Sequence, residues 1–570
     1  MPRLDYGAVF ARMLDWGSGG FCSVAPADPV ESRSRAYLDN TMVLQTTFVT
    51  RGTEATVTDA LLMRPGGRMD PLQELVRVIE GVRGDSTFQI EVVPRFDYGA
   101  VKPWIRRAGR RTWAVLGGDD GLLISCDVPL ELRDQHDLVA RVKVRGEQRV
   151  RLSIRYVRPH LIDEGELDGE IAKRIDDGLK TTSRLWHTWS RGCDFNSPDR
   201  AAVLRSALVL KALQYAPTGA IAAAATTSLP EEMGGARNWD YRFSWIRDSF
   251  LSIRSLASIG LTRESDGFRR FIQRTSAGSA HQLQIMYGLG GERRLTEFEL
   301  PFLEGYRSSK PVRIGNGAAE QEQLDAYGDL LLLAWEWHQR GHSPDDDYWR
   351  FLCDLVEVTC DRWKDPDRGI WEMRGEPRHF VHSKVLCWAA IDRGIALAEE
   401  SMRQAPLARW KRTVKQVRDS ILENGVDRRR GCFVQSYGST ALDSSLLLIP
   451  GAGFVDYADQ LMVGTVNAIR KDLEEDGLLL RYRTATADDG LGTGREGFFL
   501  ACTFWLAECL AGQGRMEEAR AVFDRVVGTS NDLGLFAEEF EPRTGELLGN
   551  FPQGLTHLAH IAAAVRLAGL

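Results

Sequence analysis

Residues 496–511 read EGFFLACTFWLAECLA, a segment that predicts an α-helix apolar on nearly every side. Residues 380–400 have the same character, whereas residues 403–423 and 514–528 carry apolar side chains on one face and charged ones on the other. Helices that are apolar all round belong in an interior, and one-sided helices pack over them. The sequence therefore predicts a ring of inner helices wrapped by outer helices.

The helical pattern continues through the whole C-terminal two thirds of the chain, from about residue 198 onward. No sequence repeat accompanies it, which argues against a helical solenoid. Six inner and six outer helices close into an (α/α)6 barrel, which we predict for residues 196–570. The twelve predicted helices span 198–216, 241–260, 262–278, 319–341, 345–364, 380–400, 403–423, 439–448, 454–473, 496–511, 514–528 and 555–568.

The first part of the chain has the pattern of β-strands. Short β-branched segments such as 88–93 and 150–157 alternate apolar and polar residues, and polar or glycine-containing turns separate them. Many short strands of this kind predict an all-β sandwich, here over residues 1–164. The highly charged range 165–195 predicts a helical linker between this domain and the barrel.

Composition excludes several classes of function. The net charge of −7 gives no basic excess, so nucleic acid is not an expected partner. The chain opens without an apolar signal sequence and contains no run of 18 apolar residues, so we expect no membrane association and a cytoplasmic location. The nine cysteines form no C-x-x-C pair, which argues against a disulfide framework and a zinc site. We predict neither a metal nor a cofactor.

Two segments carry carboxyl groups suited to acid–base chemistry. In GIWEMRG (369–375), Glu372 follows two apolar residues, and such neighbours keep a carboxylic acid protonated near neutral pH. In LFAEEFEP (535–542), Glu538 and Glu539 precede a turn. The chain has 79 acidic residues, so an exposed loop explains either segment at least as well on spacing alone.

The densest cluster of polar and aromatic residues is NWDYRFSWIRD (238–248). Adjacent Arg247 and Asp248 could grip sugar hydroxyl groups from two sides, while aromatic rings close over a sugar ring. The other interpretation is the first turn of a helix with an aspartate cap and buried aromatic side chains. The residues alone favour neither interpretation.

This cluster resembles the signature of glycoside hydrolase family 15, the glucoamylase and trehalase group. The N-terminal region is similar to the sandwich of the bacterial branch, whose members carry an extra stretch before Arg3, so we expect one or two strands to be missing here. The resemblance implies an (α/α)6 barrel, an inverting mechanism and attack at the non-reducing end. Other segments that resemble the family, in the family's order, are 285–294, 311–316, 321–328, 371–375, 380–384, 435–438, 496–505 and 549–553.

The resemblance also implies roles for individual residues. Glu372 matches the family's general acid, and Glu538 matches the general base, with Glu539 as the fallback. An inverting mechanism would place the two carboxyl groups roughly 6.5–9.5 Å apart, which leaves room for a water molecule. The residues that match substrate-binding positions are Tyr241, Trp239, Arg247, Asp248, Gln323, Asp325, Trp371, Arg374 and Arg481.

From this resemblance we predict an inverting exo-acting glycoside hydrolase. Its expected substrate is a small α-glucoside such as a malto- or isomaltooligosaccharide, from which it would release β-glucose. An α,α-trehalase is the alternative, because both activities place glucose in the same terminal pocket. A catalytically silent sugar-binding protein on the same fold is a remoter alternative, as is a phosphorylase, which would lack the base at Glu538. Oligomeric state is not readable from the sequence.

Overall fold

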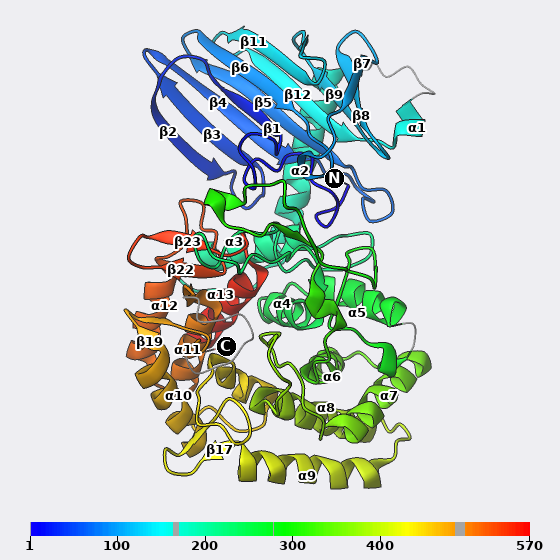
Figure 1. Cartoon of the computed structure of the whole chain (residues 1–570), viewed down its shortest axis with the longest axis vertical. Helices are drawn as coiled ribbons and strands as arrows, with labels where there is room; N and C mark the ends of the chain where they lie inside the picture. Colours follow the sequence, from blue (N-terminus) through cyan, green and yellow to red (C-terminus); the bar gives the residue numbers. More distant parts are fainter. Residues whose placement is uncertain (1, 163–169, 277–278, 485–495, 570) are drawn as a thin grey trace. The chain divides into compact units, whose positions relative to one another are not determined.

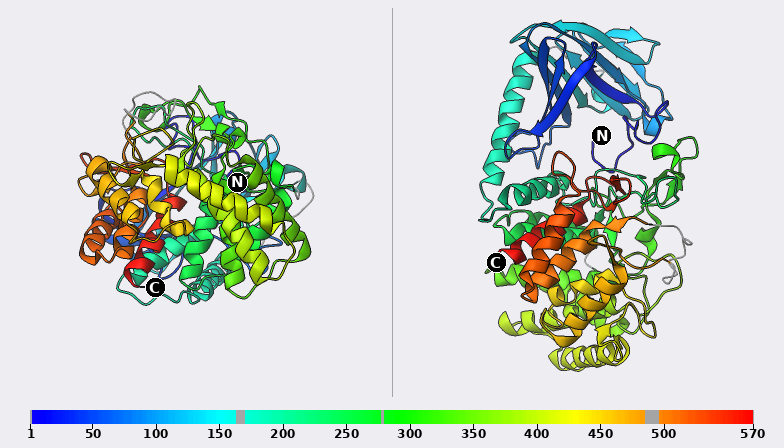
Figure 2. Two further views of the ribbon diagram at one scale, coloured as in Figure 1. Left: turned by 90° about the horizontal axis from the view of Figure 1, so that it is seen from below. Right: turned by 90° about the vertical axis from the view of Figure 1, so that its left-hand side faces the viewer.

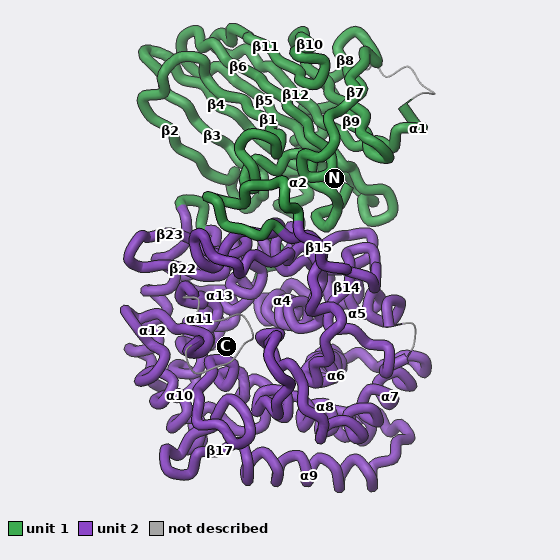
Figure 3. The backbone as a smooth tube through the Cα atoms, in the orientation of Figure 1, with its two compact units in different colours: residues 1–193, 300–312, 532–534 green, residues 194–299, 313–531, 535–570 purple. Residues whose placement is uncertain are grey.

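A computed structural model describes residues 2–162, 170–276, 279–484 and 496–569 (Figure 1). The chain divides into two compact units, which are described separately (Figure 3). The first contains residues 1–193, 300–312 and 532–534, and the second contains residues 194–299, 313–531 and 535–570. The first unit is built mainly from strands, and the second mainly from helices.

The first unit is a β-sandwich of two antiparallel sheets. One has eight strands in the order β2-β3-β4-β5-β12-β9-β8-β7, and the other has four in the order β1-β6-β11-β10. This confirms the predicted all-β sandwich. The strands are β1 (Phe21–Pro26), β2 (Val30–Tyr37), β3 (Leu44–Thr50), β4 (Thr53–Leu61), β5 (Glu74–Arg83), β6 (Ser86–Val93), β7 (Trp104–Arg107), β8 (Thr112–Gly117), β9 (Asp120–Cys126), β10 (Glu131–Arg133), β11 (Asp137–Val144) and β12 (Arg149–Tyr156).

The alternating pattern of β6 shows why these segments form a sandwich. Phe88, Ile90 and Val92 are fully buried, while Gln89 between them is exposed. Successive side chains of a strand point to opposite faces, so the three apolar residues share the face that is buried. They belong to the main core cluster, together with residues of the eight-stranded sheet such as Ile124.

Helix α2 (Ile171–Ser190) lies in the range that we predicted as a linker, and in the structure it packs on the sandwich. Its Ile175 is fully buried against Val76 and Val78 of β5. Asp176 receives two hydrogen bonds from Arg151 of β12, at 2.9 and 2.7 Å. The helix is therefore held to the eight-stranded sheet by an apolar contact and an ion pair. A short helix, α1 (Pro159–Ile162), precedes it.

The second unit is an (α/α)6 barrel, as predicted (Figures 1 and 2). Six inner elements form a closed ring in which each contacts the next and the last contacts the first. In ring order they are α4 (Ile246–Ser258), α6 (Asp325–Gln339), α8 (Val381–Glu400), η5 (Ser444–Leu448), α11 (Leu500–Gly512) and α13 (Gly554–Leu567). The outer helices are α3 (Arg200–Leu213), α5 (Glu264–Thr275), α7 (Asp346–Arg362), α9 (Leu407–Asn424), α10 (Gln460–Leu473) and α12 (Met516–Val527).

Burial separates the inner from the outer helices in the way their sequences predict. Nearly every residue of α11 is buried. In α9 the buried residues are Trp410, Thr413, Val417 and Ile421, which recur every three or four positions and so form one stripe. The apolar pattern therefore locates each helix in its layer.

One of the twelve predicted helices is wrong in type. Residues 439–448 contain no α-helix but end in the short 3₁₀ helix η5, which another short 3₁₀ helix, η6 (Pro450–Ala452), follows. Asp443 caps η5 by accepting a hydrogen bond from the amide of Ser445. Pro450 with Gly451 and Gly453 interrupts regular helix at this point. The inner ring is thus closed by a much shorter element at this position.

Short strands precede three of the inner helices and fix the loops that carry the site. β13 (Ser244–Trp245) leads into α4 and pairs with β14 (Met286–Tyr287). β21 (Phe498–Phe499) leads into α11 and pairs with β22 (Glu539–Glu541), which also pairs with β23 (Glu546–Leu548) before α13. The other two-residue strands are β15 (Phe298–Glu299), β16 (Arg313–Ile314), β17 (Val426–Asp427), β18 (Cys432–Phe433), β19 (Glu474–Glu475) and β20 (Leu478–Leu479).

Candidate active site

The loops before the inner helices enclose a pocket in two parts that share Tyr241, Trp371, Glu372 and Arg481. We call the part that also contains Glu538 the inner pocket and the other part the outer pocket. Further lining residues of the inner pocket are Ala223, Trp245, Arg247, Asp248, Ile370, Phe499, Gln553 and Leu555. Those of the outer pocket are Arg237, Trp239, Asn316, Ala318, Met373 and Arg374 with Tyr482.

Glu372 lies in the loop before α8 and is held by residues of the loop before α4. The indole N–H of Trp245 donates a hydrogen bond of 2.6 Å to its Oε1. The Nη1 of Arg247 lies 3.7 Å from the same oxygen and also donates to the carbonyl of Ile370 at 2.7 Å. Because these contacts engage Oε1, Oε2 is the oxygen that is left to present a proton to a ligand in the pocket.

The surroundings of Glu372 act in opposite directions on its pKa. Burial raises the pKa, while the positive charge of Arg247 and the hydrogen bond from Trp245 lower it, and the net effect is a raised pKa. Burial penalises the charged form of a carboxyl group, so it favours the protonated acid. The surroundings of Glu372 therefore favour its protonated form, which is the form that can donate a proton.

The backbone of Glu372 is also unusual, because its φ is +58°. A residue with a side chain rarely adopts this conformation, and such residues cluster at functional sites. The loop is tightened by Gly369, whose φ of +67° and close approach to the ring of Phe380 leave no space for a side chain. The amide of Glu372 donates to the carbonyl of Gly369 at 3.1 Å. This tight turn directs the carboxyl group into the pocket.

Glu538 and Glu539 stand side by side, and the strand alternation sends them to different places. Glu538 lines the inner pocket. Glu539, the first residue of β22, instead accepts a hydrogen bond of 2.9 Å from the amide of Gly497 and lines neither part of the pocket. Gly549 packs directly under the Glu538 carboxyl group, where an added Cβ would lie 2.5 Å from Oε2. Geometry thus favours Glu538 over Glu539 as the group that meets a ligand.

The Glu538 carboxyl group is 2% exposed, and its pKa is raised well above the usual value. Burial is the main cause, followed by the nearby carboxyl group of Glu231. Arg481 and hydrogen bonds from the side chains of Tyr241 and Gln553 act the other way, because they stabilise the carboxylate. A carboxylate with raised proton affinity is a stronger base.

Arg247 and Asp248 sit at the first turn of α4 and line the inner pocket. The Nε of Arg247 donates to Asp248 Oδ2 at 3.0 Å. Asp248 is 2% exposed, and the pair leaves donor and acceptor atoms next to each other at the wall of the pocket. Such a pair suits the recognition of adjacent hydroxyl groups.

Arg481 is fixed by acidic groups behind the pocket. Its Nε and Nη2 donate to the two oxygens of Glu496 at 2.7 and 2.8 Å, which is a bidentate pair. Nη2 also donates to Glu231 Oε2 at 3.1 Å, and Arg237 forms an ion pair of 2.9 Å with Glu496. These buried contacts hold the guanidinium group against both parts of the pocket.

Trp239 and Arg374 line the outer pocket. The guanidinium group of Arg374 lies 4.2 Å from the centre of the Trp239 ring, and that of Arg313 lies 4.5 Å from it. Arg374 also forms an ion pair of 2.8 Å with Glu297. The Trp239 ring therefore contacts two guanidinium groups, and of these two arginines only Arg374 is among the residues that line the outer pocket.

Two predicted binding residues do not reach the pocket. Gln323 and Asp325, at the start of α6, are buried and line neither part of it. Asp325 Oδ2 lies 3.7 Å from Nδ1 of His382, and burial lowers the pKa of that imidazole to about 3, so it stays neutral. The positive charge of Arg247, which lines the inner pocket, lowers the pKa of both Asp325 and His382.

Several residues of the site were not among the predicted catalytic and binding residues. Trp245 lies in the 238–248 cluster but was not singled out as the donor to Glu372. Gln553 lies in a segment that resembles the family, and Asp443 accepts a hydrogen bond of 2.8 Å from the indole of Trp371. Only proximity in the fold shows these partners, because each pair is widely separated in sequence.

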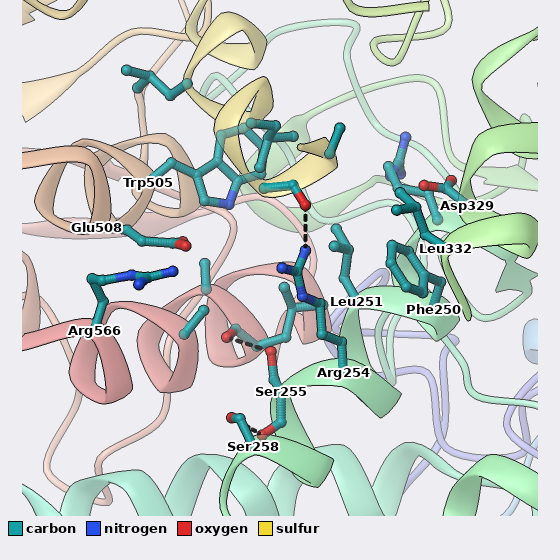
Figure 4. A pocket seen from close by; sticks show the side chains of 18 of the residues that line it. Phe250, Leu251, Arg254, Ser255, Ser258, Asp329, Leu332, Trp505, Glu508 and Arg566 are labelled. Carbon is teal, nitrogen blue, oxygen red and sulfur yellow. Dashed lines mark hydrogen bonds between the residues drawn. The ribbon is translucent and has the colours of Figure 1, made fainter. Parts of the chain in front are cut away.

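A larger cavity of about 370 Å³ lies on the axis of the barrel and is lined by residues of all six inner elements (Figure 4). Side chains from α4, α6 and α11, such as Arg254, Asp329 and Trp505, surround it. It shares Arg247 and Ile370 with the inner pocket, but its lining includes neither Glu372 nor Glu538. The two candidate carboxyl groups therefore lie at the inner pocket and not at this cavity.

Residues 2–162, 170–276, 279–484 and 496–569 contain neither a metal-binding cluster nor a membrane-spanning helix. No group of three or more His, Cys, Asp or Glu side chains in this part of the chain is arranged to hold a metal ion. Among the same residues, no helix has the length and apolar character needed to cross a membrane. All nine cysteines are free thiols.

Comparison with known proteins identifies both units. Residues 197–565 match the family model described as glycosyl hydrolases family 15, and residues 1–164 match the model described as trehalase-like, N-terminal. The barrel and its pocket with two carboxyl groups are thus those of a glycoside hydrolase. The chain belongs to glycoside hydrolase family 15.

Curated relatives extend over the whole chain. A trehalase of Mycolicibacterium smegmatis is 39% identical over 100% of this chain and 87% of its own length. A trehalase of Mycobacterium tuberculosis is 38% identical, over 100% and 85%. A trehalase of Thermoplasma volcanium is 35% identical, over 100% and 89%.

Among solved structures, a bacterial glucoamylase complexed with acarbose has a similar fold. Its TM-score is 0.73 at 11% identity, and the match covers 96% of this chain and 86% of that one. A wild-type glycosidase matches with a TM-score of 0.51 at 19% identity, over 65% of this chain and 96% of that one. At these identities the likeness concerns the fold alone.

Proposed function

We propose that the protein is an inverting α,α-trehalase, the alternative that the sequence left open, and not an enzyme for malto- or isomaltooligosaccharides. The observation that carries this proposal is that relatives named trehalase, at 35–39% identity, match 100% of this chain. The trehalase-like model for the N-terminal unit supports it as well. The glucoamylase likeness does not compete, because it rests on the fold.

In the proposed reaction, Glu372 protonates the glycosidic oxygen of trehalose as the bond to the anomeric carbon breaks. Glu538 takes a proton from a water molecule that attacks the same carbon from the opposite face. The attacked ring leaves as β-glucose, and the other ring leaves as α-glucose. One water is consumed for two glucose molecules.

The two parts of the pocket support this assignment. The inner pocket holds both carboxyl groups together with Arg247 and Asp248, so we assign the attacked glucose to it. The outer pocket begins at the same Glu372 and offers Arg237, Asn316 and Arg374, so we assign the leaving glucose to it. Polar side chains in both parts suit a substrate that carries hydroxyl groups on both rings.

The decisive experiment is proton NMR of fresh digests of trehalose, maltose and isomaltose, with the anomeric glucose signals followed over time. We expect trehalose to be hydrolysed fastest and to give equal initial amounts of α- and β-glucose. α-Glucose alone would show retention. Maltose turnover without trehalose turnover would show a glucoamylase-type enzyme. Glu372→Gln purified in the same way is the control against a contaminating glycosidase.

A further inference from the structure

A cluster of buried charged groups lies behind the wall of the pocket near Glu538. It contains four carboxyl groups but two guanidinium groups, and each of the six residues is less than one tenth exposed. Burying an unpaired charge is costly, so the four carboxyl groups cannot all be ionised together. The members are Glu231, Glu496, Glu538, Glu539, Arg237 and Arg481.

The guanidinium groups are not shared equally among the carboxyl groups. Glu496 receives the bidentate pair from Arg481 and the ion pair from Arg237. Glu231 receives a hydrogen bond from Arg481 at Oε2, and the side chain of Trp239 also favours its carboxylate form, but its Oε1 has no hydrogen-bond partner in the described part of the chain. Glu496 is thus the carboxylate that balances the cations, and Glu231 is only half satisfied.

Glu539 differs from Glu231, although both are buried and incompletely bonded. Glu539 accepts from the neutral amide of Gly497, and burial raises its pKa well above the usual value. Glu231 contacts a guanidinium group, and burial raises its pKa to about 7. Burial therefore favours the protonated form of both carboxyl groups, and Glu231 differs from Glu539 because the guanidinium group beside it favours its charged form.

Glu231 is also tied structurally to the base. The amide of Gly549 donates a hydrogen bond of 2.7 Å to the carbonyl of Pro230, the residue before Glu231. Gly549 is the residue that packs against the Glu538 carboxyl group. The amide of Glu231 donates to the carbonyl of Arg237 at 3.1 Å, which closes its own loop. The loop that carries Glu231 is thus bonded to the residue that packs on Glu538, and the negative charge of Glu231 raises the pKa of Glu538.

We propose that Glu231 is a positioning residue that shares one proton with Glu538 and thereby sets the pH range in which Glu538 acts as base. When Glu231 holds the proton, Glu538 is ionised and ready to accept a proton from water. When Glu231 is ionised, its charge strengthens the proton affinity of Glu538. The inference rests on the proposed role of Glu538 but not on the identity of the sugar.

The test is the pH profile of kcat/KM for Glu231→Gln, on whichever α-glucoside the wild-type enzyme hydrolyses. The substitution removes the charge, keeps the size, and leaves an oxygen to accept from Arg481. Two groups that share a proton delay each other's ionisation, so removing one lets Glu538 ionise earlier. We expect the acidic limb of the profile to move to lower pH by about one unit.

Matched variants separate this role from a structural one. Glu232→Gln makes the same change at the next, more exposed residue and should leave the profile unchanged. Glu231→Asp keeps a titratable carboxyl group and should keep the wild-type limb. Thermal unfolding of each variant checks folding, and Glu231→Ala replaces the Gln variant if that one does not fold.

An acidic limb that stays at the wild-type pH in the neutral variants, with the rate lowered equally at all pH values, would overturn the proposal. Movement of the limb to higher pH would also overturn it. A wild-type enzyme that is inactive on trehalose but active on maltose would contradict the proposed function alone, since the same pH profiles can then be measured with maltose.

Discussion

Replacement of Glu372 by Gln tests the proposed acid directly. The change removes the proton donor but keeps the size of the side chain, and the amide oxygen can still accept from the indole of Trp245, which now donates to Oε1 at 2.6 Å. General acid catalysis contributes roughly 10²–10⁴-fold to a rate, which corresponds to about 2.7–5.4 kcal/mol of activation free energy. We expect kcat on trehalose to fall by that factor.

The assay must separate loss of the proton from loss of the pocket. α-Glucosyl fluoride has a leaving group that departs without protonation, so its hydrolysis should fall much less than that of trehalose. As the proposed acid, Glu372 would lose its proton on the alkaline limb of the pH profile, and its raised pKa moves that limb to higher pH. That alkaline limb should disappear in the variant, because no proton remains to be lost at this position.

The matched control is Glu376→Gln, the same substitution at an exposed residue of the same loop, which should keep wild-type kinetics. A Glu372→Gln enzyme with near-normal turnover of trehalose would refute the assignment of the acid. An equal loss on trehalose and on the fluoride, with unchanged thermal unfolding, would show that Glu372 shapes the pocket and does not donate the proton.

Two further predictions follow from the same geometry. Glu538→Gln should lower kcat on trehalose by roughly 10²–10⁴-fold through loss of the base. Glu539→Gln should keep most of its turnover, because its new amide oxygen can still accept the hydrogen bond from Gly497. The opposite order of the two variants in steady-state assays would make Glu539 the base. Trp245→Phe removes a hydrogen bond that favours the ionised form of Glu372, so the pKa of Glu372 should rise. The alkaline limb of the pH profile should then move to higher pH by about one unit. A limb that does not move would show that this hydrogen bond does not set the pKa of Glu372.

The architecture of the barrel could be predicted because long helices leave a strong sequence signal. Eleven of the twelve predicted segments contain an α-helix, and the apolar or one-sided pattern of segments such as 496–511 and 403–423 identified their layer. The prediction of an α-helix over 439–448 was wrong because a short apolar run has no periodicity that distinguishes an α-helix from other conformations. There the capping side chain of Asp443 and the following Pro450 select a short 3₁₀ helix.

The candidate site was only partly predictable, for a related reason. Glu372 and Glu538 do share one pocket, because both lie in loops that precede inner helices of the ring. Gln323 and Asp325 lie equally close to the start of an inner helix, yet they do not line that pocket. The position that a side chain takes near the start of a helix depends on tertiary packing, and the local sequence does not determine it. Contacts such as Arg481 with Glu231, 250 residues apart, are invisible at that level.

The uneven distribution of charge around the pocket has a consequence for the proposed mechanism. Glycoside hydrolysis passes through a transition state in which the anomeric carbon becomes positively charged. On the Glu538 side the ionised carboxylate of Glu538 is the negative group that lines the inner pocket, and on the Glu372 side Arg247 lies 3.7 Å from the carboxyl oxygen. A carboxylate fixed where positive charge develops lowers the activation barrier without reorganisation. Arg247, meanwhile, stabilises the carboxylate that Glu372 becomes once its proton has gone to the leaving sugar, so each side of the pocket favours the charge that forms there.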